Sequence, residues 1–236
     1  SDSVHVTGVL RYSNTDADMN DTNYDTTSPL FGYVIDTPGK RFKNEALYGL
    51  LSAKFTGLDG RWITSLSGQF ADTERKGYSS FGFDSGNKGV RHKGSLVSSL
   101  TLGSTIQHRL TGVIDVERES FQNTTPSPYV FNGKRHTNNV GFVGQYELFS
   151  DRFSFGASVR HDENTRFDDS TTWRVQSSYT LPTGTRAHAA YGTGVKNPTY
   201  YELFGYSDGT YIGNPDLKPE KSKGWEFGIE QRLGHN

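Results

Sequence analysis

The chain has 236 residues, is 32% hydrophobic and 22% charged, and carries a formal net charge of −1. It contains no run of about 18 apolar residues, which excludes a helical membrane protein. It has no cysteine, which excludes disulfides and thiolate metal sites. A membrane β-barrel stays open, because only every second residue of a membrane-spanning strand faces lipid.

Ten segments alternate apolar and polar residues with the period of two that is typical of a strand with two unlike faces. Most have about 9 to 11 residues, the length expected of a strand that crosses a membrane. In chain order, the predicted strands span residues 4–13, 46–55, 61–70, 95–103, 110–121, 139–148, 152–162, 171–181, 186–195 and 225–233.

The connections between these segments alternate between short and long. Short turns are predicted near Leu58, Ser104, Asp151 and Thr183, and long loops begin near Asn14, Asp72, Gln122, Glu163 and Lys196. Outer-membrane barrels are built with short periplasmic turns and longer extracellular loops. The pattern therefore predicts an all-β fold, a transmembrane antiparallel up-and-down β-barrel. A soluble β-sandwich that binds carbohydrate or metal is the alternative architecture.

The polar faces of the predicted strands carry charged residues, which could form either the wall of a polar lumen or a catalytic site, as in a ten-stranded outer-membrane protease. His161 and Asp162 are neighbours in a strand, so their side chains point to opposite faces and cannot form one acid–base unit. No nucleophile elbow, phosphate-binding glycine loop or basic patch for nucleic acid is present. We expect no enzyme and a lumen wall that includes Arg11, Lys54, Asp115, Glu117, Arg160, Asp162, Glu226, Glu230 and Arg232.

The Asp-rich first loop is a candidate metal site. Asp16, Asp18 and Asn20 follow the one-three-five spacing of a calcium loop, but Asp21 and Thr27 stand where the turn glycine and the bidentate glutamate should be. A solvated polar loop and a loop made rigid by calcium both stay open.

Two segments near the end of the chain resemble a known family. GTGVKNPTYYELFG, followed by GNPDLKPEKSKGWEFGIE, is similar to the barrel signature of TonB-dependent outer-membrane receptors. Within that family the vitamin B12 (cobalamin) receptor branch is the most similar, because RHDENTRFDDSTTW resembles its strand-loop-strand segment and NYDTTSPLFGYVIDT its calcium-binding loop. By this resemblance Tyr24 and Asp25 fall on a pair of calcium ligands, and Asp36 falls on the next acidic ligand.

The resemblance implies a 22-stranded barrel with a plugged lumen. Residues 1–236 supply about ten strands, so we expect an internal part of the barrel domain, without the plug and the remaining strands. Its open edges would then pair with the rest of the barrel or close into a smaller one.

The implied protein is a bacterial outer-membrane receptor that contacts lipid, captures a scarce nutrient and is energised by TonB through the plug. Cobalamin is the expected nutrient, and a siderophore or a sugar also fits. The aromatic residues of the last long loop offer contact area to such a ligand, although aromatic residues near strand ends also mark a membrane interface. The candidate ligand contacts are Tyr200, Tyr201, Phe204, Tyr206 and Tyr211.

Overall fold

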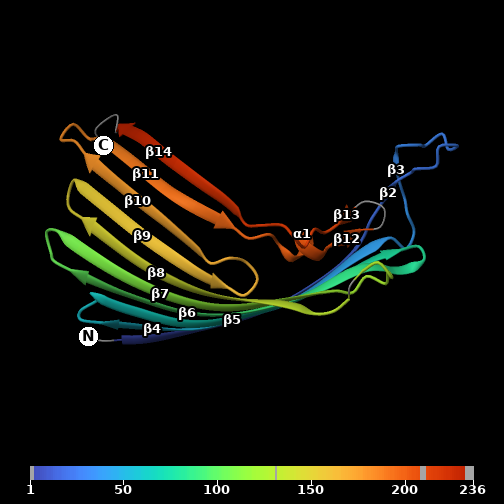
Figure 1. Ribbon diagram of the computed structural model, residues 1–236, viewed down its shortest axis with the longest axis horizontal. Helices are drawn as coiled ribbons and strands as arrows, with labels where there is room; N and C mark the ends of the chain where they lie inside the picture. Colours follow the sequence, from blue (N-terminus) through green and yellow to red (C-terminus); the bar gives the residue numbers. More distant parts are fainter. Residues whose placement is uncertain (1–2, 131, 208–210, 232–236) are drawn as a thin grey trace.

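Ten long strands form one antiparallel sheet in the computed structural model, which describes residues 3–130, 132–207 and 211–231 (Figure 1). Each strand pairs with its neighbours along the chain, as in an up-and-down barrel. The strands are β1 (Ser3–Asp18), β4 (Arg41–Gly57), β5 (Trp62–Ser79), β6 (Gly82–Leu102), β7 (Gln107–Asn123), β8 (Arg135–Phe149), β9 (Phe153–Asn164), β10 (Ser170–Thr180), β11 (Thr185–Lys196) and β14 (Glu220–Gln231). All ten predicted strands are confirmed; Arg232 and Leu233, assigned to the last one, lie outside the described residues.

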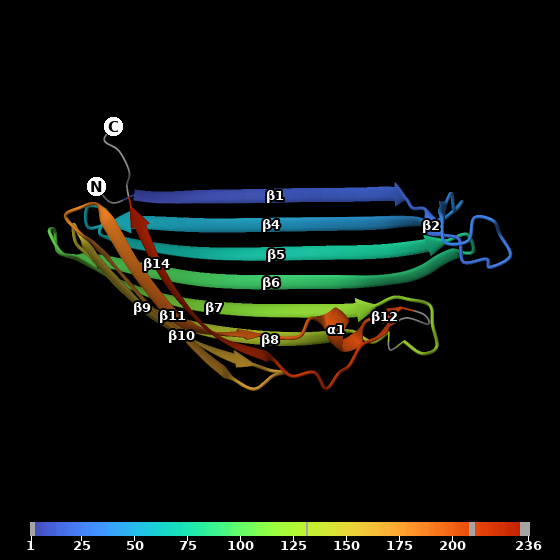
Figure 2. The ribbon, with the colours of Figure 1, turned by 90° about the horizontal axis from the view of Figure 1, so that it is seen from above.

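The sheet is curved and open. β1 and β14 are its two outermost strands, and the order of pairing runs from one to the other without closing. In Figure 1, β9, β10, β11 and β14 curve up from the rest of the sheet, and the short helix α1 (Tyr200–Phe204) lies on the same concave side; Figure 2 shows the same arrangement from above. The free edges of β1 and β14 therefore carry backbone N–H and C=O groups that can pair with further strands.

The predicted loop from Asp72 to Lys93 is wrong, because this segment is a strand hairpin. β5 runs to Ser79 and β6 starts at Gly82, so the connection has two residues instead of about twenty. The pairing continues past a register shift at Gly77 and Tyr78. Both faces of this hairpin are polar, so the hydrophobic alternation that predicts strands is lost here while the backbone ladder continues.

Three of the other long connections are confirmed, whereas the one near Glu163 has only five residues; all four lie at the same end of the sheet as this hairpin. They span residues 19–40, 124–134, 165–169 and 197–219, and the short turns span 58–61, 103–106, 150–152 and 181–184 at the opposite end. The first long connection contains a small ladder of β2 (Asp21–Thr22) and β3 (Val34–Ile35), and the last contains α1 and a ladder of β12 (Tyr206–Ser207) and β13 (Tyr211–Ile212). No helix in the described part of the chain is long and apolar enough to cross a membrane.

One face of the sheet is apolar and exposed. Leu51 is 63% exposed, Leu66 60% and Phe227 64%, whereas the only hydrophobic side chains that are buried in the described ranges are Ala46 and Leu203. A soluble β-sandwich buries such a face against a second sheet, and the described residues form a single layer. The sandwich alternative is therefore wrong, and the exposed apolar face has the character of a surface that contacts lipid.

We predict that the apolar face of β7 tolerates a charged side chain poorly and that its polar face tolerates one well. Ile114→Arg adds a cation to the apolar face, where hydrocarbon does not solvate it, and we expect it to lower the free energy of unfolding by about 2–4 kcal/mol. Thr111→Arg is the matched control on the polar face, between Ser99 and Gln145, and should cost far less. Denaturant unfolding of the full-length protein from liposomes measures both; equal losses would contradict the assignment of faces.

Candidate functional site

The connection between β11 and β14 begins with a capped helical turn. Thr199 is the N-cap of α1: its hydroxyl accepts from the Glu202 backbone N–H at 3.2 Å, and its backbone N–H donates to Glu202 Oε2 at 2.6 Å. This is the capping box expected of a Thr-x-x-Glu sequence. The backbone donor, together with the Thr199 hydroxyl, holds the pKa of Glu202 below its usual range. Leu203, on the buried side of the turn, is 2% exposed.

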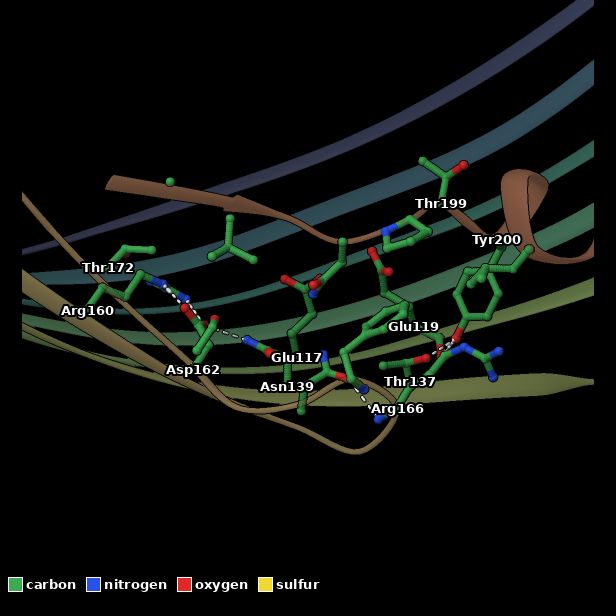
Figure 3. A pocket seen from close by; sticks show the side chains of 18 residues that line it. Glu117, Glu119, Thr137, Asn139, Arg160, Asp162, Arg166, Thr172, Thr199 and Tyr200 are labelled. Carbon is green, nitrogen blue, oxygen red and sulfur yellow. Dashed lines mark hydrogen bonds and ion pairs between the residues drawn. The ribbon is translucent and has the colours of Figure 1, made fainter. Parts of the chain in front are cut away.

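Tyr200 fastens this helix to the inner face of the sheet (Figure 3). Its hydroxyl donates to Thr137 Oγ1 at 2.7 Å and also lies 3.3 Å from the Glu119 carbonyl oxygen. Its ring stacks on Phe121 with centroids 5.5 Å apart and planes 8° from parallel. Burial raises the pKa of the Tyr200 hydroxyl. The last long connection is thus anchored to Glu119 in β7 and Thr137 in β8, which precede Tyr200 by 81 and 63 residues.

Phe204 lies between two guanidinium groups. Arg135 Cζ is 4.0 Å from the ring centroid and Arg166 Cζ is 4.6 Å from it, within the range of a cation–π interaction. Arg166 also donates to the Pro215 carbonyl oxygen at 3.4 Å. Sequence reasoning missed both arginines, because Arg135 is the first residue of β8 and Arg166 lies in the connection between β9 and β10, and only the fold brings them to this loop.

The other predicted ligand contacts also lie in this loop. Tyr201 is half exposed and stacks on Tyr211 at 4.9 Å between centroids, and the Tyr211 hydroxyl lies 3.2 Å from two carbonyl oxygens of α1. Tyr206 pairs with Ile212 in the β12–β13 ladder. The structure therefore brings all five predicted aromatic residues into one loop. Tyr200, Phe204 and Tyr211 also pack the loop together, and a role in binding stays a prediction.

A cavity of about 440 Å³ separates this loop from the wall of the sheet (Figure 3). Polar side chains of four strands form one side, and the start of the loop forms the other. Its lining includes Glu117, Glu119, Thr137, Asn139, Arg160, Asp162, Arg166, Phe167, Thr172, Asn197, Pro198, Thr199, Tyr200 and Leu203. A space of this size and polarity suits part of a bulky polar ligand.

The charged groups of the wall neutralise one another. Arg160 holds Asp162 with two hydrogen bonds of 2.6 and 2.7 Å and reaches Asp115 at 3.1 Å. Asp115 also accepts from Ser95 at 2.6 Å. His161, one residue away, contacts Thr171 at 2.9 Å on the opposite face. Asp162 and His161 therefore form no acid–base pair, and the charges of Arg160, Asp162 and Asp115 compensate one another, as a polar lumen wall requires.

The first connection does not gather carboxylates around one point. Asp25 Oδ1 accepts from the Thr27 backbone N–H at 2.8 Å and from its hydroxyl at 2.6 Å, which lowers the pKa of Asp25. Tyr24 is 75% exposed and Asp36 is exposed. No group of three or more His, Cys, Asp or Glu in the described ranges is placed to hold a metal ion. Calcium binding by Tyr24, Asp25 and Asp36 stays a prediction.

The one-three-five spacing does not form a calcium loop. Asp16 and Asp18 are the last residues of β1, where the chain is extended, and Asp16 pairs with Lys43 at 3.0 Å. Asp21, in β2, is paired with Lys40. The polarity of the segment reflects strands that continue beyond the apolar belt.

Residues 5–236 match the family model described as TonB dependent receptor-like, beta-barrel. The fold is similar to that of the siderophore receptor PirA from Acinetobacter baumannii (TM-score 0.72, 14% identity, 97% of this chain and 39% of that one). It is also similar to the siderophore receptor PirA from Pseudomonas aeruginosa (TM-score 0.67, 15% identity, 95% of this chain and 44% of that one). A third similar structure is the ferric yersiniabactin uptake receptor FyuA from Yersinia pestis (TM-score 0.56, 18% identity, 98% of this chain and 40% of that one). The chain spans less than half the length of each, and at these identities the likeness shows the fold alone.

The Arg160 network predicts a loss of stability when its cation is removed. Arg160→Ala leaves Asp115 and Asp162, with side chains 11% and 21% exposed, without their main partner, and should cost about 1–3 kcal/mol. Arg186→Ala removes an exposed pair with Glu230 and should cost less than about 1 kcal/mol. Denaturant unfolding of the full-length protein measures the free energy of unfolding of both variants. A smaller loss of stability in Arg160→Ala than in Arg186→Ala would refute the role of the network.

The hydrogen bond from Tyr200 to Thr137 predicts how firmly the last long connection is held. Tyr200→Phe keeps the ring but removes the donor, which should cost about 1 kcal/mol and speed amide exchange in α1 about fivefold. Tyr201→Phe is the control, because the Tyr201 hydroxyl has no hydrogen bond to a described residue. Hydrogen–deuterium exchange of residues 200–206 measures both variants, and an equal response would exclude the anchoring role.

Proposed function

Because the chain belongs to the TonB dependent receptor-like β-barrel family, we propose that it forms part of the barrel of a receptor that imports a scarce nutrient with energy delivered by TonB. The family is located in the outer membrane, so the apolar face of the sheet contacts outer-membrane lipid. In the complete receptor, TonB acts through a plug domain inside the barrel. The chain supplies the wall and several of the outer connections.

We propose a ferric siderophore as the nutrient. Three of the similar structures are named as siderophore or ferric yersiniabactin receptors, which supports this class of ligand. The observation that carries the proposal is the cavity beneath the last long connection, which Arg166, Phe167 and Tyr200 line together with polar side chains of the wall. Cations and aromatic rings complement a bulky, anionic, oxygen-rich iron chelate.

The charged residues on the inner face of the sheet contribute to passage of the ligand more than to its capture. Arg160 is committed to Asp115 and Asp162, and Arg91 to Glu117 at 2.6 Å, so these charges satisfy one another without a ligand. A ligand released from the outer loops then meets a wall with little net charge, which binds it weakly. Capture therefore depends on the loop groups, above all Arg166 and the aromatic residues around it.

Cobalamin is the second candidate. The resemblance of the segment with Tyr24, Asp25 and Asp36 to a calcium-binding loop of cobalamin receptors supports it. Under this alternative, calcium would hold the first connection in place. The carboxylates nearest to such a calcium site already have other partners, because Asp25 accepts a hydrogen bond from Thr27 and Asp21 forms an ion pair with Lys40. No step of the proposed transport depends on the ion.

Calorimetric titration of the purified full-length receptor tests the proposal. The ligands are ferric catecholate, ferric hydroxamate and ferric citrate complexes, and cyanocobalamin, each with and without calcium. We expect one ferric complex to bind, and Arg166→Gln to weaken its binding about tenfold through loss of a charged contact. Arg152→Gln, at a short turn on the opposite end of the sheet, is the control and should bind like the native receptor.

The outcomes separate the two candidates. Binding of cyanocobalamin alone, and only with calcium, would replace the siderophore with the second candidate. If none of these compounds binds, both the siderophore and the cobalamin proposals are excluded. Equal affinities of Arg166→Gln and the native receptor for the ferric complex would show that the cavity is not the site.

A further inference from the structure

A groove of about 750 Å³ lies on the apolar, lipid-facing side of the sheet. Residues that point to this side line it on six neighbouring strands, among them Leu10, Leu51, Gly68, Val116 and Val140. The residues of the polar face in its lining, such as Gln69 and Glu117, each lie between two such residues in their strand. They therefore contribute backbone, and the groove is separate from the cavity beneath the loop.

Glycines form the floor of the groove. A Cβ at Gly68 would meet no atom within 4 Å, so the sheet is bare at this point. At Gly49 the Phe70 ring occupies the space that a side chain would need. Leu10 is 74% exposed and Leu51 is 63% exposed beside this floor. The result is an open apolar groove across the strands, of a kind that a lipid acyl chain can fill.

A row that contains Arg118 and His92 bounds the groove on the side nearest the long connections. Phe70, His92, Arg118 and Asn138 lie directly opposite one another on β5, β6, β7 and β8. Toward the short turns, the next row on this face is Gly94, Val116 and Val140, so the polar side chains begin where the apolar belt ends. This is the depth at which lipid headgroups meet a barrel wall.

In the part of the chain that the structure describes, no acidic side chain pairs with Arg118. The lipid-facing positions of β7 and β8, and those of β6 from Lys88 onward, include no Asp or Glu. Arg118 forms no ion pair with a described residue, whereas Arg91 and Arg160 on the opposite face are both paired. The nearest acids on this side are Asp72, which pairs with Lys88 at 3.6 Å, and Glu163 on β9.

We propose that this groove binds an outer-leaflet lipid with a phosphorylated headgroup. The acyl chain lies along Gly68, Leu51 and Val116, and the phosphate is held by Arg118 and His92, with Asn138 as a further donor. Arginine and histidine are suited to phosphate, and basic sites at the membrane boundary select anionic headgroups. The inference depends on the outer-membrane location and not on the transported nutrient.

Native mass spectrometry of the full-length receptor tests the proposal with two probes, lipid A with its phosphates and the same lipid A after their removal. The native receptor should prefer the phosphorylated lipid. Arg118→Gln should weaken that binding about fivefold and leave the dephosphorylated lipid unaffected. Gly68→Leu fills the groove and should weaken both, whereas Gly112→Leu adds the same side chain to open space on the same face outside the groove.

The result that would overturn the proposal is equal affinity of the native receptor for the two lipids, which can be measured without any variant. Unchanged binding by Arg118→Gln would remove the phosphate site. An equal loss in Gly68→Leu and Gly112→Leu would show general lipid contact and no defined groove. The heat-dependent mobility of each variant on gels establishes that it is folded.

Discussion

Every backbone N–H and C=O that lies in hydrocarbon must be hydrogen-bonded within the protein, because lipid offers no partner. This constraint accounts for a sheet in which each strand pairs with the strands next to it along the chain. It also accounts for the open edges of β1 and β14, which need further strands before they can lie in a bilayer. Once the backbone is satisfied by pairing, the two faces of each strand are free to differ.

The two faces of the sheet differ in polarity and in how their charges are paired. The lipid-facing side has apolar residues with a bare groove, at whose edge Arg118 lies without an ion pair to any described residue. The inner side has polar residues whose charges are paired in groups such as Asp115, Arg160 and Asp162. The last long connection is fastened over this inner wall by Tyr200 and by the packing of Phe204 with two arginines. Under the proposed function, capture and passage thus belong to different residues, which suits a receptor that must bind tightly and then release.

Much of the fold could be predicted from the sequence, because a two-residue period with one apolar face is a local signal. Prediction failed between Asp72 and Lys93, where the strands extend beyond the apolar belt and the signal ends while the backbone pairing continues. The aromatic residues of the last loop were found by composition. Their partners Thr137, Arg135 and Arg166 were not, because these lie far away in sequence and carry no pattern.

The central claim is that β7 crosses the outer membrane with one face toward lipid and the other toward a watery lumen. The chain has no cysteine, so single cysteines can be introduced at residues 110 to 117 of the full-length receptor and spin-labelled in liposomes. We predict that accessibility to oxygen peaks at residues 110, 112, 114 and 116, and that accessibility to a water-soluble nickel chelate peaks at the positions between them. Accessibility that does not alternate along this segment would contradict the account.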